Sequence, residues 1–123
     1  MLLVEDEPDS RDCLALTLTQ YGAEVTAVGS AAEASVALDA GQVDVLLSDL
    51  AMPGEDGFSL IRRVRTRAPE RGGRIPAAAL SAYARADERA RAMLAGFDLH
   101  LAKPVEAAQL ASAVLDLAAR ASG

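Results

Sequence analysis

Cysteine, aromatic residues and long apolar runs are all scarce in this sequence. Cys13 is the one cysteine among 123 residues, which excludes a scaffold held together by disulfides. No run approaches the roughly 18 apolar residues that a membrane-spanning helix needs. The apolar residues 1–4 meet acidic residues and lack the basic segment of a secretion signal. We therefore expect a cytoplasmic protein with no membrane partner.

Basic residues are nearly absent from the first half of the chain. Residues 1–60 hold twelve acidic side chains and one basic side chain, Arg11, and the formal net charge of the whole chain is −6. This balance argues against nucleic acid as a direct partner, because phosphate contacts need Lys and Arg. The twelve acidic residues are either solvated surface residues or part of a functional site, and the net charge alone does not distinguish these two interpretations.

The apolar content is high, and it is arranged in a regular order. Hydrophobic residues make up 51% of the chain, which excludes a disordered protein and supplies a core for one domain over residues 1–123. Strands are predicted at residues 2–4, 25–28, 43–47, 75–80 and 99–102. Helices are predicted between Pro8 and Gly22, between Ser30 and Gly41, and at 58–67, 84–95 and 105–119. This alternation predicts an α/β fold of the (βα)5 type, with helices on both faces of a parallel sheet.

Apolar side chains of the first two helices are expected to face the core. In the second helix, Ser30 and Glu33 form a capping-box pattern, and Val36 with Leu38 supplies the apolar face. In the first helix, the side chains predicted to lie mostly inward are Cys13, Leu14, Leu16, Leu18 and Tyr21.

Polar residues follow the carboxyl ends of four predicted strands, where ligands bind in sheets of this kind. They are Glu5-Asp6-Glu7 after the first strand, Asp49 after the third, Ser81 after the fourth and Lys103 after the fifth. Crowded carboxylates repel one another unless a cation joins them, and Mg²⁺ is a hard cation that accepts a few carboxylates. A lysine ammonium group and a hydroxyl group next to Mg²⁺ can bind the oxygens of a phosphoryl group. The sequence thus predicts a magnesium and phosphoryl site.

Four segments at these strand ends resemble the receiver domain of two-component response regulators. They are VEDEP at 4–8, LSDLAMPGEDG at 47–57, ALSA at 79–82 and LAKP at 101–104, in the order and spacing of that family. The resemblance implies a doubly wound, flavodoxin-like fold with five strands in the order 2-1-3-4-5.

The resemblance also implies roles for acidic residues and for one carbonyl group. Asp49 matches the aspartate that accepts the phosphoryl group. Asp6 matches a direct Mg²⁺ ligand and Glu5 its partner, acting through water. The backbone carbonyl of Ala51 matches the third protein ligand, so the metal set is Glu5, Asp6, Asp49 and Ala51.

Three further residues are implied to contact the phosphoryl group. Ser81 matches the hydroxyl residue of the family, Ala82 leaves room for the phosphoryl group, and Lys103 pairs with it. The Lys103–Pro104 bond matches a cis peptide. Tyr83, two residues after Ser81, is a candidate shield of the phosphoryl group against water.

The implied function is that of a signalling module. The chain would take a phosphoryl group from a histidine kinase or a histidine phosphotransfer domain onto Asp49 with Mg²⁺. Phosphorylation would switch the surface formed by residues 84–95, 99–102 and 105–119, where a homodimer or intramolecular contact is expected. Enzymatic activity would be limited to self-phosphorylation from small donors and autodephosphorylation.

His100 departs from the family pattern. That position usually holds Tyr or Phe, which turns inward on phosphorylation. His100 is either a surface residue of an edge strand or a working switch.

Three alternative functions stay open. With a histidine at this position the chain resembles the receivers of hybrid histidine kinases, so a relay or phosphate-sink receiver excised from such a kinase is one alternative. A second alternative is a haloacid-dehalogenase-like phosphatase, although Ala51 stands where that enzyme needs its second aspartate. A third is a receiver-like module that never carries phosphate and works only by binding a partner.

Overall fold

Strands and helices alternate along the chain in this computed structural model, which describes residues 1–41, 43–82 and 85–122. A short 3-10 helix, η1 (Pro69–Arg71), precedes the fourth strand. The other elements are β1 (Leu2–Val4), α1 (Pro8–Gln20), β2 (Thr26–Val28), α2 (Ala31–Ala40), β3 (Leu46–Asp49), α3 (Gly57–Arg65), β4 (Ala77–Ser81), α4 (Ala86–Ala95), β5 (Leu99–Ala102) and α5 (Ala107–Ser122).

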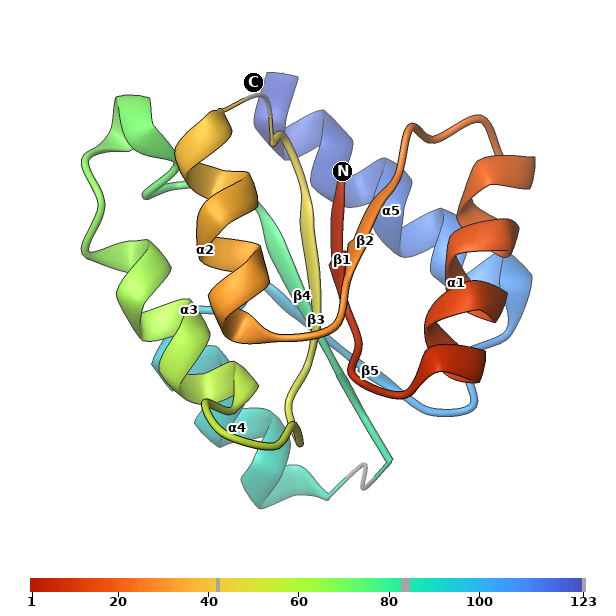
Figure 1. Cartoon of the computed structure of the whole chain (residues 1–123). Coiled ribbons are helices and arrows are strands. Elements are labelled where there is room, and N and C mark those ends of the chain that lie inside the picture. Colours follow the sequence, from red (N-terminus) through yellow and green to blue (C-terminus); the bar gives the residue numbers. More distant parts are fainter. Residues whose placement is uncertain (42, 83–84, 123) are drawn as a thin grey trace.

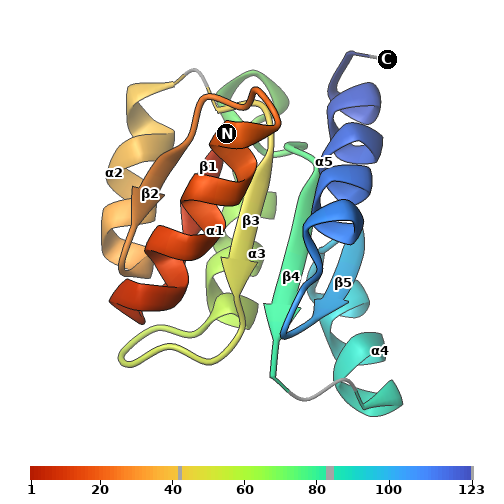
Figure 2. The same ribbon diagram turned by 90° about the vertical axis from the view of Figure 1, so that its right-hand side faces the viewer.

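The five strands form one sheet in the order β2-β1-β3-β4-β5. Every neighbouring pair is parallel. Helices α2, α3 and α4 lie on one side of the sheet and α1 and α5 on the other (Figure 1), and the view in Figure 2 places α1 and α5 in front of the strands. The predicted doubly wound α/β fold and its strand order are confirmed.

Alternate side chains of the strands enter two separate cores, because successive residues of a strand point to opposite faces. Leu2, Val4 and Leu46 pack with Leu60 and Ile61 of α3. On the opposite face, the core contains Leu3, Leu47, Leu80, Leu18 of α1 and Leu110 and Leu117 of α5. Both faces are therefore dry, which explains the nearly unbroken apolar character of the inner strands.

The third strand lies later in the sequence than predicted. We expected residues 43–47, whereas β3 is Leu46–Asp49. Its start is set by pairing with the three-residue β1, in which Leu2 lies opposite Leu46. Its end is set by β4, where Leu80 lies opposite Asp49. Pairing with neighbours, rather than the apolar run, thus makes Asp49 the last residue of the strand.

The predicted inward face of α1 is wrong for three residues, and so is that of Val36 in α2. Cys13 is exposed, and Leu16, Tyr21 and Val36 are 60%, 58% and 70% exposed. Only the stripe of α1 that includes Leu14 and Leu18, one turn apart, packs on the sheet. Side chains on the far side of such a helix face solvent even when they are apolar.

The cap predicted for α2 is present in a modified form. The Ser30 hydroxyl accepts a hydrogen bond from the backbone N–H of Glu33 at 3.1 Å. The Glu33 carboxylate reaches back to the N–H of Gly29 at 2.8 Å, one residue before the cap. None of the helices in the described ranges has the length and apolar character needed to cross a membrane.

Candidate functional site

The predicted site residues meet at the carboxyl edge of the sheet, toward which the arrowheads of β3 and β4 point in Figure 2. Glu5 and Asp6 directly follow β1, Asp49 ends β3, Ser81 ends β4, and Lys103 directly follows β5. Because the strands are parallel, their carboxyl ends share one edge, and residues far apart in the sequence become neighbours there.

Three carboxylates cluster at this edge. Glu5, Asp6 and Asp49 each offer one oxygen, and these oxygens all lie within 4.8 Å of one another. Glu5 is 1% exposed and Asp49 is 6% exposed, so two of the three are almost fully removed from water. Buried like charges at this separation need positive charge beside them.

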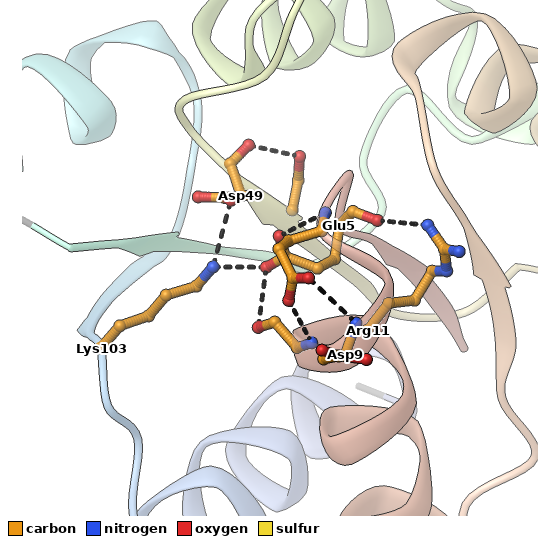
Figure 3. Close-up of polar contacts among 8 residues, drawn as sticks. Glu5, Asp9, Arg11, Asp49 and Lys103 are labelled. Atoms are coloured by element: carbon orange, nitrogen blue, oxygen red, sulfur yellow. Dashed lines mark hydrogen bonds and ion pairs between the residues drawn. The ribbon is translucent and has the colours of Figure 1, made fainter.

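Lys103 supplies part of that positive charge (Figure 3). Its Nζ donates to Oε2 of Glu5 and, at 3.1 Å, to Oδ2 of Asp49. Burial alone lowers the pKa of Lys103, but the hydrogen bonds to Glu5 and Asp49 outweigh it and raise this pKa above its ordinary value. Lys103 is therefore a fixed cation that joins the end of β1 to the end of β3.

One cation does not compensate the whole cluster. Burial, helped by the charge of Glu5, raises the pKa of Asp49 to about 6 although Lys103 opposes it. Burial also tends to raise the pKa of Glu5, but hydrogen bonds from Lys103 and from the Glu7 N–H leave this pKa below its usual value. A second positive charge would favour the ionised form of Asp49. The all-oxygen donor set fits a hard divalent cation.

The turn that carries Glu5 and Asp6 is fixed by contacts within the first helix. Glu7 caps α1, accepting from the N–H groups of Asp9 at 3.2 Å and Ser10 at 2.6 Å. The Ser10 hydroxyl donates to Glu5 Oε2 at 3.4 Å, and Arg11 Nη1 donates to the Glu5 carbonyl at 3.0 Å (Figure 3). The roles of Ser10 and Arg11 were missed. The pair Glu7-Pro8 could have indicated this helix cap from the sequence, because proline favours the first position of a helix.

An open pocket lies beside Asp49. Ala51, Ser81, Ala82 and Lys103 line it together with Asp49, so it gathers the residues expected around a phosphoryl group. Ala51 and Ala82 are exposed and leave the approach clear. The other lining residues are Leu50, Met52, Pro53, Asp56, Phe58 and Glu88.

The first turn of α3 approaches the end of β3 very closely. The Gly57 N–H donates to the Leu50 carbonyl at 2.9 Å. A Cβ atom at Gly57 would lie 2.3 Å from the Asp49 carbonyl oxygen, far inside van der Waals contact. Asp56 caps the helix by accepting from the Ser59 N–H at 2.8 Å. A residue without a side chain at position 57 thus allows α3 to support the Asp49 backbone.

His100 lies inward, so the interpretation as a surface residue is wrong. Its side chain is 4% exposed, and its Nε2 lies 4.0 Å from Oε1 of Glu88. The same nitrogen lies 2.9 Å from Oγ of Ser81. Burial lowers the pKa of His100 below its ordinary value, against the opposing effect of Glu88. The sequence carried no signal for this contact, which depends on how β4 and β5 pair.

The remaining features concern residues around Lys103 and Ser81. The Lys103–Pro104 peptide bond is cis, as the resemblance implied. Tyr83, the suggested shield, lies outside the described residues.

Comparison with known proteins agrees with this geometry. The family model for the response regulator receiver domain matches residues 1–115. An uncharacterised 14.6 kDa protein of Leptolyngbya boryana is 44% identical over 110 residues, which cover 89% of this chain and 82% of that protein. The response regulator protein FleR of Pseudomonas aeruginosa is 39% identical over 120 residues, or 98% of this chain but 24% of FleR.

A solved structure supports the same assignment. The signal receiver domain of a signal transduction histidine kinase from Syntrophus aciditrophicus superposes with a TM-score of 0.85 at 29% identity, covering 97% of this chain and 89% of that one. Sequence, fold and the arrangement of acids, hydroxyl and lysine at the carboxyl edge agree, and the chain belongs to the response regulator receiver domain family of two-component signalling.

Proposed function

We propose that this receiver accepts a phosphoryl group on Asp49 from the phosphohistidine of a histidine kinase or a histidine phosphotransfer domain in the cytoplasm. The observation that carries the proposal is the Asp49 carboxylate, buried at a strand end beside Glu5 and Asp6, held by Lys103 and facing an open pocket. We take residues 1–123 to act as a single receiver unit.

In the transfer, an Asp49 oxygen attacks the phosphorus atom, the new O–P bond forms and the N–P bond of the donor breaks. The electron pair of that bond returns to the donor imidazole. Lys103 places positive charge beside Asp49, and the Ser81 hydroxyl lines the same pocket as a donor for a phosphoryl oxygen.

Glu5, Asp6, Asp49 and the carbonyl of Ala51 would hold Mg²⁺. When bound, the ion supplies positive charge that neutralises phosphoryl oxygens. The raised pKa of Asp49 supports this assignment, because the attacking group must be ionised and Lys103 alone does not keep its pKa at the ordinary value.

The output surface would be formed by α4, β5 and α5. Ser81 ends β4 and contacts His100 in β5, so a change at the phosphorylation site reaches an edge strand directly. We propose that this surface contacts a second copy or another domain of the same chain.

A second candidate is a relay or phosphate-sink receiver within a hybrid histidine kinase. It is favoured by the likeness to a receiver domain of a histidine kinase. The phosphatase alternative is not retained, because the family model that matches residues 1–115 is that of the receiver domain.

The test is incubation with acetyl phosphate and Mg²⁺, followed by intact mass measurement. We expect the mass of one phosphoryl group to be added to the wild-type chain and none to Asp49→Asn. Asp12→Asn removes an exposed carboxylate of α1 and serves as the matched control, with full phosphorylation expected. Equal phosphorylation of wild type and Asp49→Asn would refute the assignment.

A further inference from the structure

Strand pairing brings His100 and Ser81 together on one face of the sheet. His100 lies opposite Ala79, and Ser81 lies opposite Ala102. Partners in a parallel register point to the same side, as do residues two apart in one strand. Ala79 packs in the core on the side of α2, α3 and α4. His100 and Ser81 are therefore diagonal neighbours on the face covered by α4, which carries Glu88.

The imidazole meets a hydroxyl and a carboxylate through a single nitrogen. Nε2 lies 2.9 Å from Ser81 Oγ and 4.0 Å from Glu88 Oε1, with the His100 side chain 4% exposed. Burial lowers the pKa of His100 below its ordinary value, with Glu88 opposing and Arg89 adding to the effect, which favours the neutral ring. A neutral imidazole carries its proton on one nitrogen only.

The surroundings of His100 favour the proton on Nε2. A carboxylate attracts an N–H group and repels a lone pair, and Glu88 is the carboxylate that faces Nε2. In that tautomer Nε2–H donates and Ser81 Oγ accepts. The hydroxyl has one proton of its own, which is then directed away from His100 and toward another acceptor.

Phosphoryl oxygens are such acceptors, and Ser81 lines the pocket beside Asp49. We propose that His100 is a positioning residue, whose Nε2–H holds the Ser81 oxygen and thereby orients the Ser81 hydroxyl proton toward a phosphoryl group on Asp49. This inference rests on the proposed function. It differs from an aromatic side chain that turns inward on phosphorylation, because here the ring is buried beside Ser81 in the unphosphorylated chain.

The first test is spectroscopic and does not depend on phosphorylation. The chain has a single histidine, so long-range ¹H–¹⁵N correlation spectra of the imidazole need no further assignment. We expect the pattern of a neutral ring protonated on Nε2 at pH 7.5. Glu88→Gln, which removes the charge but keeps a polar side chain, should shift the population toward the Nδ1–H tautomer. A ring protonated mainly on Nδ1 in the wild type would overturn the proposal.

The second test measures binding of beryllofluoride, a phosphoryl mimic, in the presence of Mg²⁺ by calorimetry. His100→Phe keeps a ring but removes the donor, and we expect about fivefold weaker binding, the worth of one ordinary hydrogen bond. His100→Gln keeps an N–H donor and should bind nearly as tightly as the wild type. Urea unfolding of each variant checks that the fold is retained.

A double-mutant cycle separates positioning from packing. If His100 acts through the Ser81 hydroxyl, His100→Phe should have no further effect on beryllofluoride binding in a Ser81→Ala background. An equal loss in both backgrounds would show a merely structural role and overturn the proposal. If the wild type shows no Mg²⁺-dependent binding that Asp49→Asn abolishes, the proposed function itself fails. If the wild type does show such binding, and His100→Phe binds beryllofluoride equally well, only the inference about His100 fails.

Discussion

At the scale of single residues, the site is defined by charges that are buried together and only partly compensated. Lys103 bonds to both Glu5 and Asp49, yet the pKa of Asp49 still rises to about 6 because of its burial. A further cation would therefore favour the ionised form of Asp49, the carboxylate that would attack phosphorus. If the protein itself neutralised the whole cluster, a bound cation would have no such effect.

His100 makes a testable contribution to the pH dependence of stability. Its pKa is lowered in the folded chain by burial and by Arg89, with Glu88 opposing, so the unfolded chain binds the proton first as the pH falls. The contribution of the neutral ring is complete above the unfolded pKa of about 6.5 and is lost as the pH falls below it. We expect the urea midpoint to fall more between pH 7.5 and 5.5 in the wild type than in His100→Gln. Parallel curves for the two proteins would contradict the buried, neutral histidine.

At the scale of secondary-structure elements, one close backbone approach connects the phosphorylation site to α3. A Cβ atom at Gly57 would overlap the Asp49 carbonyl oxygen. We expect Gly57→Ala to destabilise the fold by about 3 kcal/mol, the upper range for overpacking, and to reduce phosphorylation of the remaining folded protein. Urea unfolding and intact mass measurement after acetyl phosphate treatment check the two effects.

Gly41→Ala is the matched control for that substitution. Gly41 has a φ of +82° and a ψ of −174°, a backbone region that is nearly confined to glycine. No atom beyond its chain neighbours lies within 4 Å of the place a Cβ atom would take, so alanine there meets only a backbone cost of about 1–3 kcal/mol. It lies at the opposite end of α2 from the site, and phosphorylation should be unchanged. If the folded fraction of Gly57→Ala were phosphorylated as readily as Gly41→Ala, the close approach of α3 would not support the phosphorylation site.

Elements were predictable from the sequence where local patterns decide them. Apolar runs located all five strands, and glycines and caps bounded the helices, so the carboxyl edge that gathers Asp49 and Lys103 was found. The limits of β3 were missed because they depend on pairing with β1. The exposure of Cys13 and Leu16 was missed because several faces of this helix carry apolar residues, and only packing selects one.

At the scale of the whole molecule, the two edges of the sheet differ in how their buried charges are compensated. Glu5 and Asp49 lie at the carboxyl edge. At the amino edge, Arg65 donates to the carbonyls of Gly96 at 2.9 Å and Ile75 at 2.7 Å, and pairs with Asp98 at 3.3 Å. The amino edge is thus held by a satisfied arginine, whereas the carboxyl edge keeps the acidic excess that a ligand can use.

This difference predicts that Mg²⁺ stabilises the whole fold through the carboxyl edge. A ligand that binds only the folded state adds about 2.7 kcal/mol at one hundred times its dissociation constant. We expect the urea midpoint of the wild type to rise with Mg²⁺ and to return when EDTA is added. Glu5→Gln and Asp49→Asn should lose most of this rise, because each removes a carboxylate of the cluster, while Asp12→Asn, an exposed acid of α1, should keep it. A rise that is the same in all four proteins would mean that Mg²⁺ acts on the acidic surface in general rather than at the strand ends.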